Sequence, residues 1–242
     1  MRTNPITVDA SRNASRLGGW ALIAATVLFA AVFTYLAIAF DYPAVLNRPA
    51  ADVLPRLLTL GTTGRAVWVL YALIPFLLIP TAIGVSAATK DAAPRAAELS
   101  VITATLAALS MSLGLLRWPS LQWQLAVAHA DASVAARESI AIAFAAANSY
   151  LGNFVGEFLG ELFLNAFFLS ASVALARAGG PSRRWLLYAG SAATLLGFVA
   201  MLRNAVPSVA LFAAANNLVL PIWMLVLGVT LVKCRRNPIQ PI

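Results

Sequence analysis

Cysteine, histidine and charged side chains are scarce in this chain of 242 residues. It has one cysteine (Cys234), one histidine (His129) and only 11% charged residues. A single cysteine excludes an intramolecular disulfide and a thiolate metal cage, and a histidine with no second one nearby disfavours a zinc site. We therefore expect no bound metal and no cofactor.

The common motifs of soluble enzymes are also missing. The chain has no Walker loop, no dinucleotide-binding glycine fingerprint, no HExxH helix and no serine-centred elbow. Phosphate and hydride chemistry therefore lack support. The net charge of +8 comes from basic residues that are scattered between apolar runs. We expect no nucleic-acid partner, and we assign this charge to anchoring and orientation in a bilayer.

Apolar residues, in contrast, make up 61% of the chain. Soluble domains are nearer one half apolar and one quarter charged, so this composition predicts a membrane protein in contact with lipid. We predict an all-α fold, a six-helix transmembrane bundle within residues 18–233, between cytoplasmic tails at 1–17 and 234–242. The six predicted spans are 18–40, 66–88, 97–116, 149–175, 185–202 and 209–232.

Two connections and one helix stand out in this arrangement. Residues 44–64 are amphipathic and too charged to cross, so we expect a short interfacial segment on the bilayer after span one. Residues 120–137 form the longest polar connection, in which we expect His129 to be solvated. Residues 135–176 have the pattern of one helix of about 63 Å, which makes the fourth helix long compared with a bilayer core.

The distribution of lysine and arginine gives an orientation. With six spans, the tails and the loops on their side carry 11 of the 17 basic residues, and the opposite loops carry 6. The positive-inside rule then places both termini in the cytoplasm. We expect a multi-pass protein of the inner (plasma) membrane.

A polar stripe lies inside the fourth predicted span. Asn153, Glu157, Glu161 and Asn165 recur every four residues, so on an α-helix successive members are rotated by only about 40°. A charged carboxylate at the centre of a span costs about 3 kcal/mol on insertion scales, so both glutamates should face protein or water. The stripe predicts an intramembrane polar pocket around the two glutamates.

Two arginines are the natural partners of these carboxylates. Arg117 and Arg203 end the third and fifth predicted spans on the outer side, where Asp41 competes for one of them. Glu157 and Glu161 are about 6 Å apart along the helix axis, which disfavours double ionisation unless a cation intervenes. A structural ion-pair cluster and a proton or solute site both fit this pattern.

Three glycines form a second stripe beside the polar one. Gly152, Gly156 and Gly160 also recur every four residues. Small residues at this spacing allow another helix to approach closely. We predict internal helix packing through these glycines, with a dimer face or a ligand groove as the alternatives.

Three short stretches resemble a family of bacterial integral membrane proteins known only as a domain of unknown function. They are Phe40-Asp41-Tyr42-Pro43-Ala44-Val45-Leu46, Leu116-Arg117-Trp118-Pro119 and Gly156-Glu157-Phe158-Leu159-Gly160. The resemblance runs from the first span to the sixth and implies this topology without an activity. Members often have histidines where this chain has Asn148 and Phe158, so the resemblance implies no metal or haem here.

Three functions stay open on the sequence alone. The first is a polar pocket that binds or transports a small solute or a proton. The second is an intramembrane enzyme acting on a lipid or isoprenoid, with one protonated glutamate as the general acid. The third is a non-catalytic sensor or assembly subunit that binds a partner, or a second copy of itself, through the glycine stripe.

Overall fold

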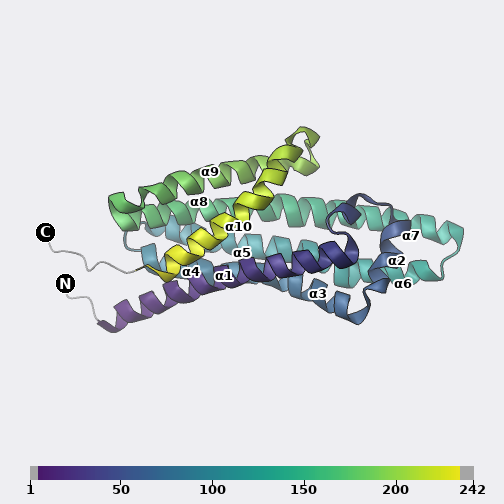
Figure 1. Ribbon diagram of the computed structural model, residues 1–242, viewed down its shortest axis with the longest axis horizontal. Helices are drawn as coiled ribbons and strands as arrows, with labels where there is room; N and C mark the ends of the chain where they lie inside the picture. The colour runs from purple at the N-terminus through teal and green to yellow at the C-terminus, as the bar shows by residue number, and fades with distance from the viewer. Residues whose placement is uncertain (1–4, 235–242) are drawn as a thin grey trace. The chain divides into compact units, whose positions relative to one another are not determined.

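The computed structural model describes residues 5–234, and every regular element in that range is helical (Figure 1). The predicted all-α fold is confirmed. Short 3-10 and π-helical segments join the α-helices. The α-helices are α1 (Pro5–Phe40), α2 (Ala50–Thr59), α3 (Gly61–Leu73), α4 (Leu78–Thr89), α5 (Pro94–Leu116), α6 (Trp123–Ala130), α7 (Val134–Ala147), α8 (Gly160–Gly179), α9 (Arg184–Ala200) and α10 (Ala210–Val232).

Five stretches of the described chain are helical, long and apolar enough to cross a membrane. The fourth has 71 residues and turns back on itself at the 3-10 segment Gly180–Arg183, so it contains the fourth and fifth predicted spans. Gly180 has a φ of 62°, a conformation that glycine adopts at little cost. The six-helix transmembrane bundle is thereby confirmed. The five stretches are Asp9–Phe40, Gly61–Thr89, Pro94–Ala130, Val134–Asn204 and Pro207–Val232.

The chain divides into two compact units, and several long helices contribute to both. Unit 1 is Met1–Thr26, Phe76–Ala108 and Glu161–Ile242, and unit 2 is Val27–Pro75 and Leu109–Gly160. Glu161 and Arg203 belong to unit 1, whereas Glu157 and Arg117 belong to unit 2.

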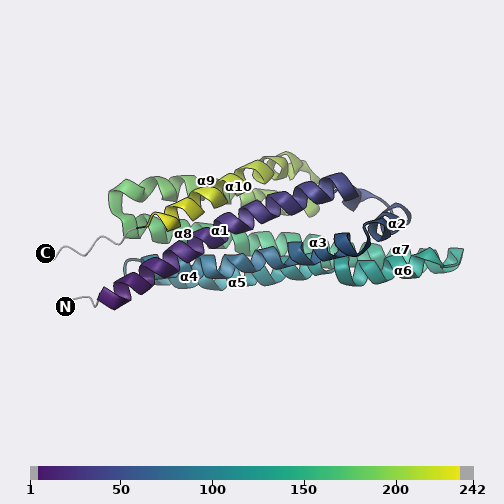
Figure 2. The ribbon, with the colours of Figure 1, turned by 60° about the horizontal axis from the view of Figure 1, so that its bottom comes forward.

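Small residues bring the helices of unit 1 together. A Cβ built on Gly18 would lie 2.9 Å from the Cα of Gly84 in α4, and one built on Gly19 would lie 2.6 Å from the carbonyl oxygen of Gly228 in α10. Backbones this close leave no room for side chains, so α1 packs directly on α4 and α10. Helix α10 also lies beside α9 (Figure 2).

The same unit joins α8 to α9 in antiparallel fashion. Gly190 faces Ser172, and Gly197 faces the side chain of Asn165. A Cβ on Gly197 would lie 2.0 Å from Asn165 Oδ1, so the fit at this contact depends on glycine. Asn165 donates from Nδ2 to the carbonyl oxygen of Glu161 at 2.8 Å and is buried.

In unit 2, the segment predicted to lie on the bilayer forms α2 and packs on protein. Helix α2 lies against α6 and α7, and its apolar residues Val53, Leu54 and Leu57 are fully buried. The amphipathic pattern arises because this apolar face meets other helices. Residues 44–47 precede it as a 3-10 turn.

The expected polar connection at 120–137 is wrong, because the helix continues past Pro119. A π-helical segment, Trp118–Gln122, leads directly into α6. The backbone N–H of Gln122 donates to the carbonyl oxygen of Arg117 at 2.7 Å, which continues the helix. The chain then turns at residues 131–133, and His129 is buried in the last turn of α6, where we had expected it to be solvated.

The observed ends of the first and last helices can be compared with the predicted tails. Helix α1 begins at Pro5, so most of the expected tail at 1–17 continues the first helix. Helix α10 ends at Val232, close to the expected end of the last span. The tail at 235–242 lies outside the described residues.

Candidate functional site

The polar stripe runs through an unusual stretch of helix. Residues Asn148–Leu159 form a π-helix, which joins α7 to α8 without a break. A π-helix bonds each amide to the fifth residue before it, so it turns more slowly than an α-helix. The rotation of about 40° expected between Asn153 and Glu157 therefore does not apply, and the stripe continues in α-helical geometry only from Glu161 to Asn165.

Glu161 forms a bidentate ion pair with Arg203 in unit 1. Arg203 Nη1 donates to Glu161 Oε2 at 2.8 Å, and Nη2 donates to Oε1 at 2.7 Å. The side chains are 16% and 27% exposed, respectively, so water screens the pair only partly. Arg203 Nη1 also donates to the carbonyl oxygen of Ala200, which holds the guanidinium against the end of α9. Two parallel hydrogen bonds give this pair a fixed geometry.

Arg117 occupies a different environment, in unit 2. Its guanidinium is buried, donates from Nε to Asn148 Oδ1 at 3.0 Å and from Nη1 to the carbonyl oxygen of Gly114. In the π-helical register that Pro119 enters, the missing proline N–H would have bonded that carbonyl, so the arginine supplies the absent donor. Gln122 Nε2 donates to Asn148 Oδ1 as well, at 3.1 Å.

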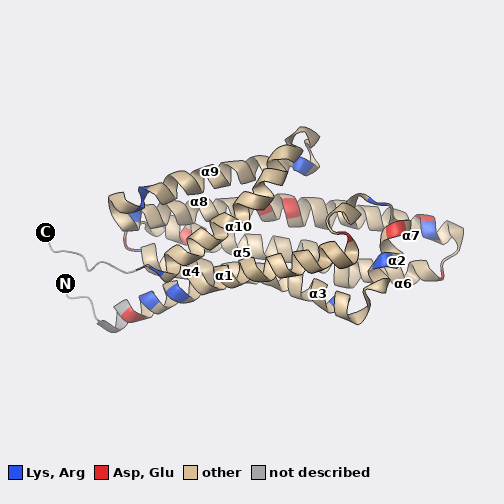
Figure 3. Ribbon diagram, viewed as in Figure 1, with Lys and Arg blue, Asp and Glu red and all other residues tan. Residues whose placement is uncertain are grey.

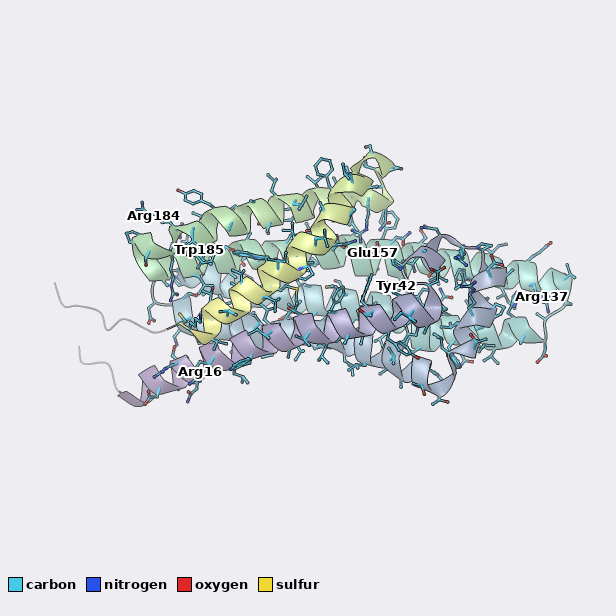
Figure 4. The ribbon with its side chains drawn as sticks, in the orientation of Figure 1. Arg16, Tyr42, Arg137, Glu157, Arg184 and Trp185 are labelled. Carbon is cyan, nitrogen blue, oxygen red and sulfur yellow. The ribbon has the colours of Figure 1, made fainter. Side chains whose placement is uncertain are left out.

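Charged and phenolic groups surround this arginine. Glu157 and Tyr42 both interact electrostatically with Arg117. Tyr71 shares a hydrogen bond with Tyr42 and lies within electrostatic range of Glu157. Tyr42 and Glu157 are labelled in Figure 4. We call these five residues (Arg117, Glu157, Tyr42, Tyr71 and Asn148) the Arg117 cluster.

A wall of aromatic rings encloses one side of the Arg117 cluster. Trp68 and Trp118 stack with ring centroids 4.9 Å apart and an interplanar angle of 16°. The ring of Phe40 packs against both in T-shaped geometry, with its centroid 5.9 Å from that of Trp68 and 5.4 Å from that of Trp118. The Arg117 guanidinium carbon lies 5.1 Å from the centre of the Trp118 ring, a cation–π contact. These rings keep water and lipid away from the arginine.

The glycine stripe also meets α5 within unit 2. Gly156 lies against Gly114, where a built Cβ would lie 2.9 Å from the Gly114 Cα. A Cβ built on Gly152 would lie 2.7 Å from the central carbon of the Arg117 guanidinium, and one built on Gly160 would lie 2.6 Å from Cγ of Met111. Within this unit, α5 thus packs against Gly156 and Gly160, and Gly152 leaves the space that the Arg117 side chain occupies.

Several expected partners are not brought together in this way. Asp41 pairs with Arg48 and lies 4.0 Å from Arg56, so its partners are neither Arg117 nor Arg203.

A cleft of about 650 Å³ in unit 2 is lined by none of the predicted site residues. Its lining residues are Ala51, Pro55, His129, Ala130, Val134, Arg137, Glu138 and Ala141.

Sequence reasoning overlooked the two tyrosines and the amide of Asn148. Tyr71 lies in an apolar span, where an aromatic residue carries no signal of a functional site. Three short stretches of the sequence, 40–46, 116–119 and 156–160, do contribute residues to this region. They contribute Phe40 and Tyr42, then Arg117 and Trp118, then Glu157, and all of these lie around the Arg117 cluster.

Comparison with known proteins adds no family to this geometry. No family model, curated protein or solved structure matches the chain. Within residues 5–234, no group of three or more His, Cys, Asp or Glu side chains could hold a metal ion. The site must therefore be interpreted from its own residues, in a helical chain with several apolar segments long enough to cross a membrane.

Proposed function

We propose that this chain is a multi-pass membrane protein that binds and passes a proton at the Arg117 cluster. The observation that carries the proposal is a buried arginine that interacts with the carboxylate of Glu157 and the phenol of Tyr42. The phenol of Tyr71 in turn interacts with both of these groups. On the family resemblance, we place the protein in the inner membrane of a bacterium, and on the distribution of lysine and arginine we place both termini in the cytoplasm.

The cluster has the chemistry that proton transfer requires. A carboxyl group and a phenol each donate and accept hydrogen bonds, so Glu157, Tyr42 and Tyr71 can pass a proton between them. Arg117 lies within electrostatic range of both Glu157 and Tyr42, so a change in the charge at either group would be felt by the guanidinium. An ionisable side chain within an apolar span is expensive and is a functional candidate by default.

The proposal is tested by infrared spectroscopy on the purified full-length protein reconstituted in lipid. We expect a pH-dependent carboxyl band that disappears in Glu157→Gln. The matched control is Glu161→Gln, which removes the carboxylate that is paired with Arg203 and should leave this band in place. In proteoliposomes carrying an internal pH dye, Glu157→Gln should also slow proton uptake.

The opposite result would assign the cluster a structural role. If Glu157→Gln folds with an unchanged thermal midpoint and changes neither the band nor the uptake, the proton site is excluded. If the variant does not fold, Tyr71→Phe takes its place, because it removes one hydroxyl and keeps the ring. An unchanged uptake in Tyr71→Phe would then count against proton transfer through the phenols.

A small polar solute is a second candidate, favoured by three buried polar atoms. Within the described chain, the indole N–H groups of Trp68 and Trp118 and the Oε1 of Gln122 have no hydrogen-bond partner. A solute bound beside them could satisfy such groups. We expect a solute from a panel of amino acids and polyols to change the tryptophan fluorescence, and Gln122→Leu to abolish the change. No response to any solute would exclude this candidate.

A further inference from the structure

We infer that one end of unit 1 is a docking surface for the phosphate groups of anionic phospholipids. This surface, the basic end, carries eight basic residues against three acidic ones, Asp9, Asp91 and Glu98. The basic residues are Arg12, Arg16, Lys90, Arg95, Arg177, Arg183, Arg184 and Lys233.

Hydrogen bonds tie the helix ends that carry these residues together. Ser11 Oγ donates to the carbonyl oxygen of Ala87 in α4, at 2.6 Å. Ser15 Oγ donates to the carbonyl oxygen of Leu231 in α10, at 3.0 Å. Arg183 Nη1 lies 3.2 Å from Cys234 Sγ, which brings the α8–α9 turn to the end of α10. The start of α1 and the ends of α4 and α10 therefore converge.

The basic side chains at this end are available to a ligand. Seven of the eight are exposed, and Arg183 is half-buried. Within residues 9–234, none of the eight forms an ion pair with a carboxylate. Figure 3 shows Lys and Arg gathered near this end of the helices of unit 1, and Arg16 and Arg184 are labelled there in Figure 4.

The rest of unit 1 shows that this asymmetry is local. The remaining charged side chains of its described residues are Glu161 and Arg203, which neutralise each other at the opposite ends of α8 and α9. One end thus has an excess of five positive charges, and the other has none. Helix ends of this kind lie at headgroup depth, where each lysine or arginine near an anionic leaflet favours binding by about fivefold.

A lipid is the occupant that this position favours. The basic end closes four apolar helices that are long enough to cross a bilayer, so headgroups surround it when the protein is embedded. Arginine and lysine recognise phosphate by charge and by N–H donors. The inference concerns unit 1 and is independent of the proton site proposed in unit 2.

Native mass spectrometry of the full-length protein in neutral detergent tests the inference. The protein is offered equal amounts of dioleoyl phosphatidylglycerol and dioleoyl phosphatidylcholine. We expect phosphatidylglycerol to be retained preferentially, and Arg12→Gln/Arg16→Gln to lower this preference by about fivefold for each charge removed. The matched control is Arg56→Gln/Arg137→Gln, which removes two exposed charges from unit 2 and should leave the preference within twofold.

Three outcomes would overturn the inference. The first is an equal retention of the two lipids by the unchanged protein. The second is an equal loss in both double variants, which would mean that only net charge matters. The third is loss of the preference in millimolar inorganic phosphate at constant ionic strength, which would assign the surface to free phosphate. If Arg12→Gln/Arg16→Gln does not fold, Lys90→Gln/Lys233→Gln supplies the same test.

Discussion

The ion pair between Glu161 and Arg203 shows how a partner lowers the free-energy cost of a carboxylate within an apolar span. A carboxylate within an apolar span is unfavourable alone, but here both its oxygens accept from one guanidinium. The pair joins α8 to the end of α9, beside the contact of Asn165 with Gly197. Its fixed geometry makes it a stabilising contact between two helices.

Glu161→Gln should therefore destabilise the protein. The amide cannot accept both hydrogen bonds, and it carries no charge opposite the partly buried guanidinium of Arg203. Because both side chains keep some exposure, we expect a loss of about 1–3 kcal/mol, seen as a lower thermal midpoint in detergent. The exposed Glu98→Gln serves as the control and should leave the midpoint unchanged. Equal midpoints for all three proteins would contradict the structural role.

At the scale of single elements, α2 shows what an amphipathic pattern does and does not determine. The sequence identifies the apolar face of this helix, but a bilayer and a pair of helices are equally apolar partners. The structure buries that face against α6 and α7.

Leu54→Ala tests this packing. Leu54 is fully buried, so the truncation should cost about 2–5 kcal/mol and expose the α6–α7 turn to limited proteolysis. The control, Arg56→Ala, changes an exposed side chain on the same helix and should have little effect. If α2 instead lies on the bilayer, Leu54→Ala will leave the proteolysis unchanged.

The apolar helices follow from hydropathy, whereas the irregular stretches between and within them do not. Apolar runs predict α5, α9 and α10 to within a few residues, because the bilayer sets the length of an apolar span. The path past Pro119 could not be predicted, because a distant feature, the hydrogen bond from Arg65 to its carbonyl oxygen, accompanies the π-helical segment.

The sequence predicts the charged residues of the candidate site but not their uncharged partners. Charge within a span reveals Glu157, Glu161, Arg117 and Arg203, but it does not assign each glutamate to an arginine. The partners of Arg117 include the side-chain amide of Asn148 and the phenol of Tyr42, which carry no charge signal in a sequence. The π-helix at 148–159 changes the faces that its residues occupy, and local sequence does not reveal it.

For the whole molecule, the single cysteine offers a direct test of orientation. Cys234 lies at the end of α10 and is half-buried. We expect a membrane-impermeant maleimide to label it in inside-out vesicles and not in right-side-out vesicles. Asp131→Cys in a Cys234→Ser background places the thiol at the α6–α7 turn and should give the reverse pattern. Labelling of Cys234 in right-side-out vesicles would mean that the C-terminal end faces the outside, opposite to the proposed topology.

The bidentate pair has one more consequence, which concerns the membrane voltage. Moving one elementary charge across 100 mV involves about 2.3 kcal/mol of electrical work. Glu161 and Arg203 move together and sum to zero, so a voltage does almost no net work on the deep charges of unit 1. Neutralising either partner would change the net charge at this point by one, and the field would act on that difference.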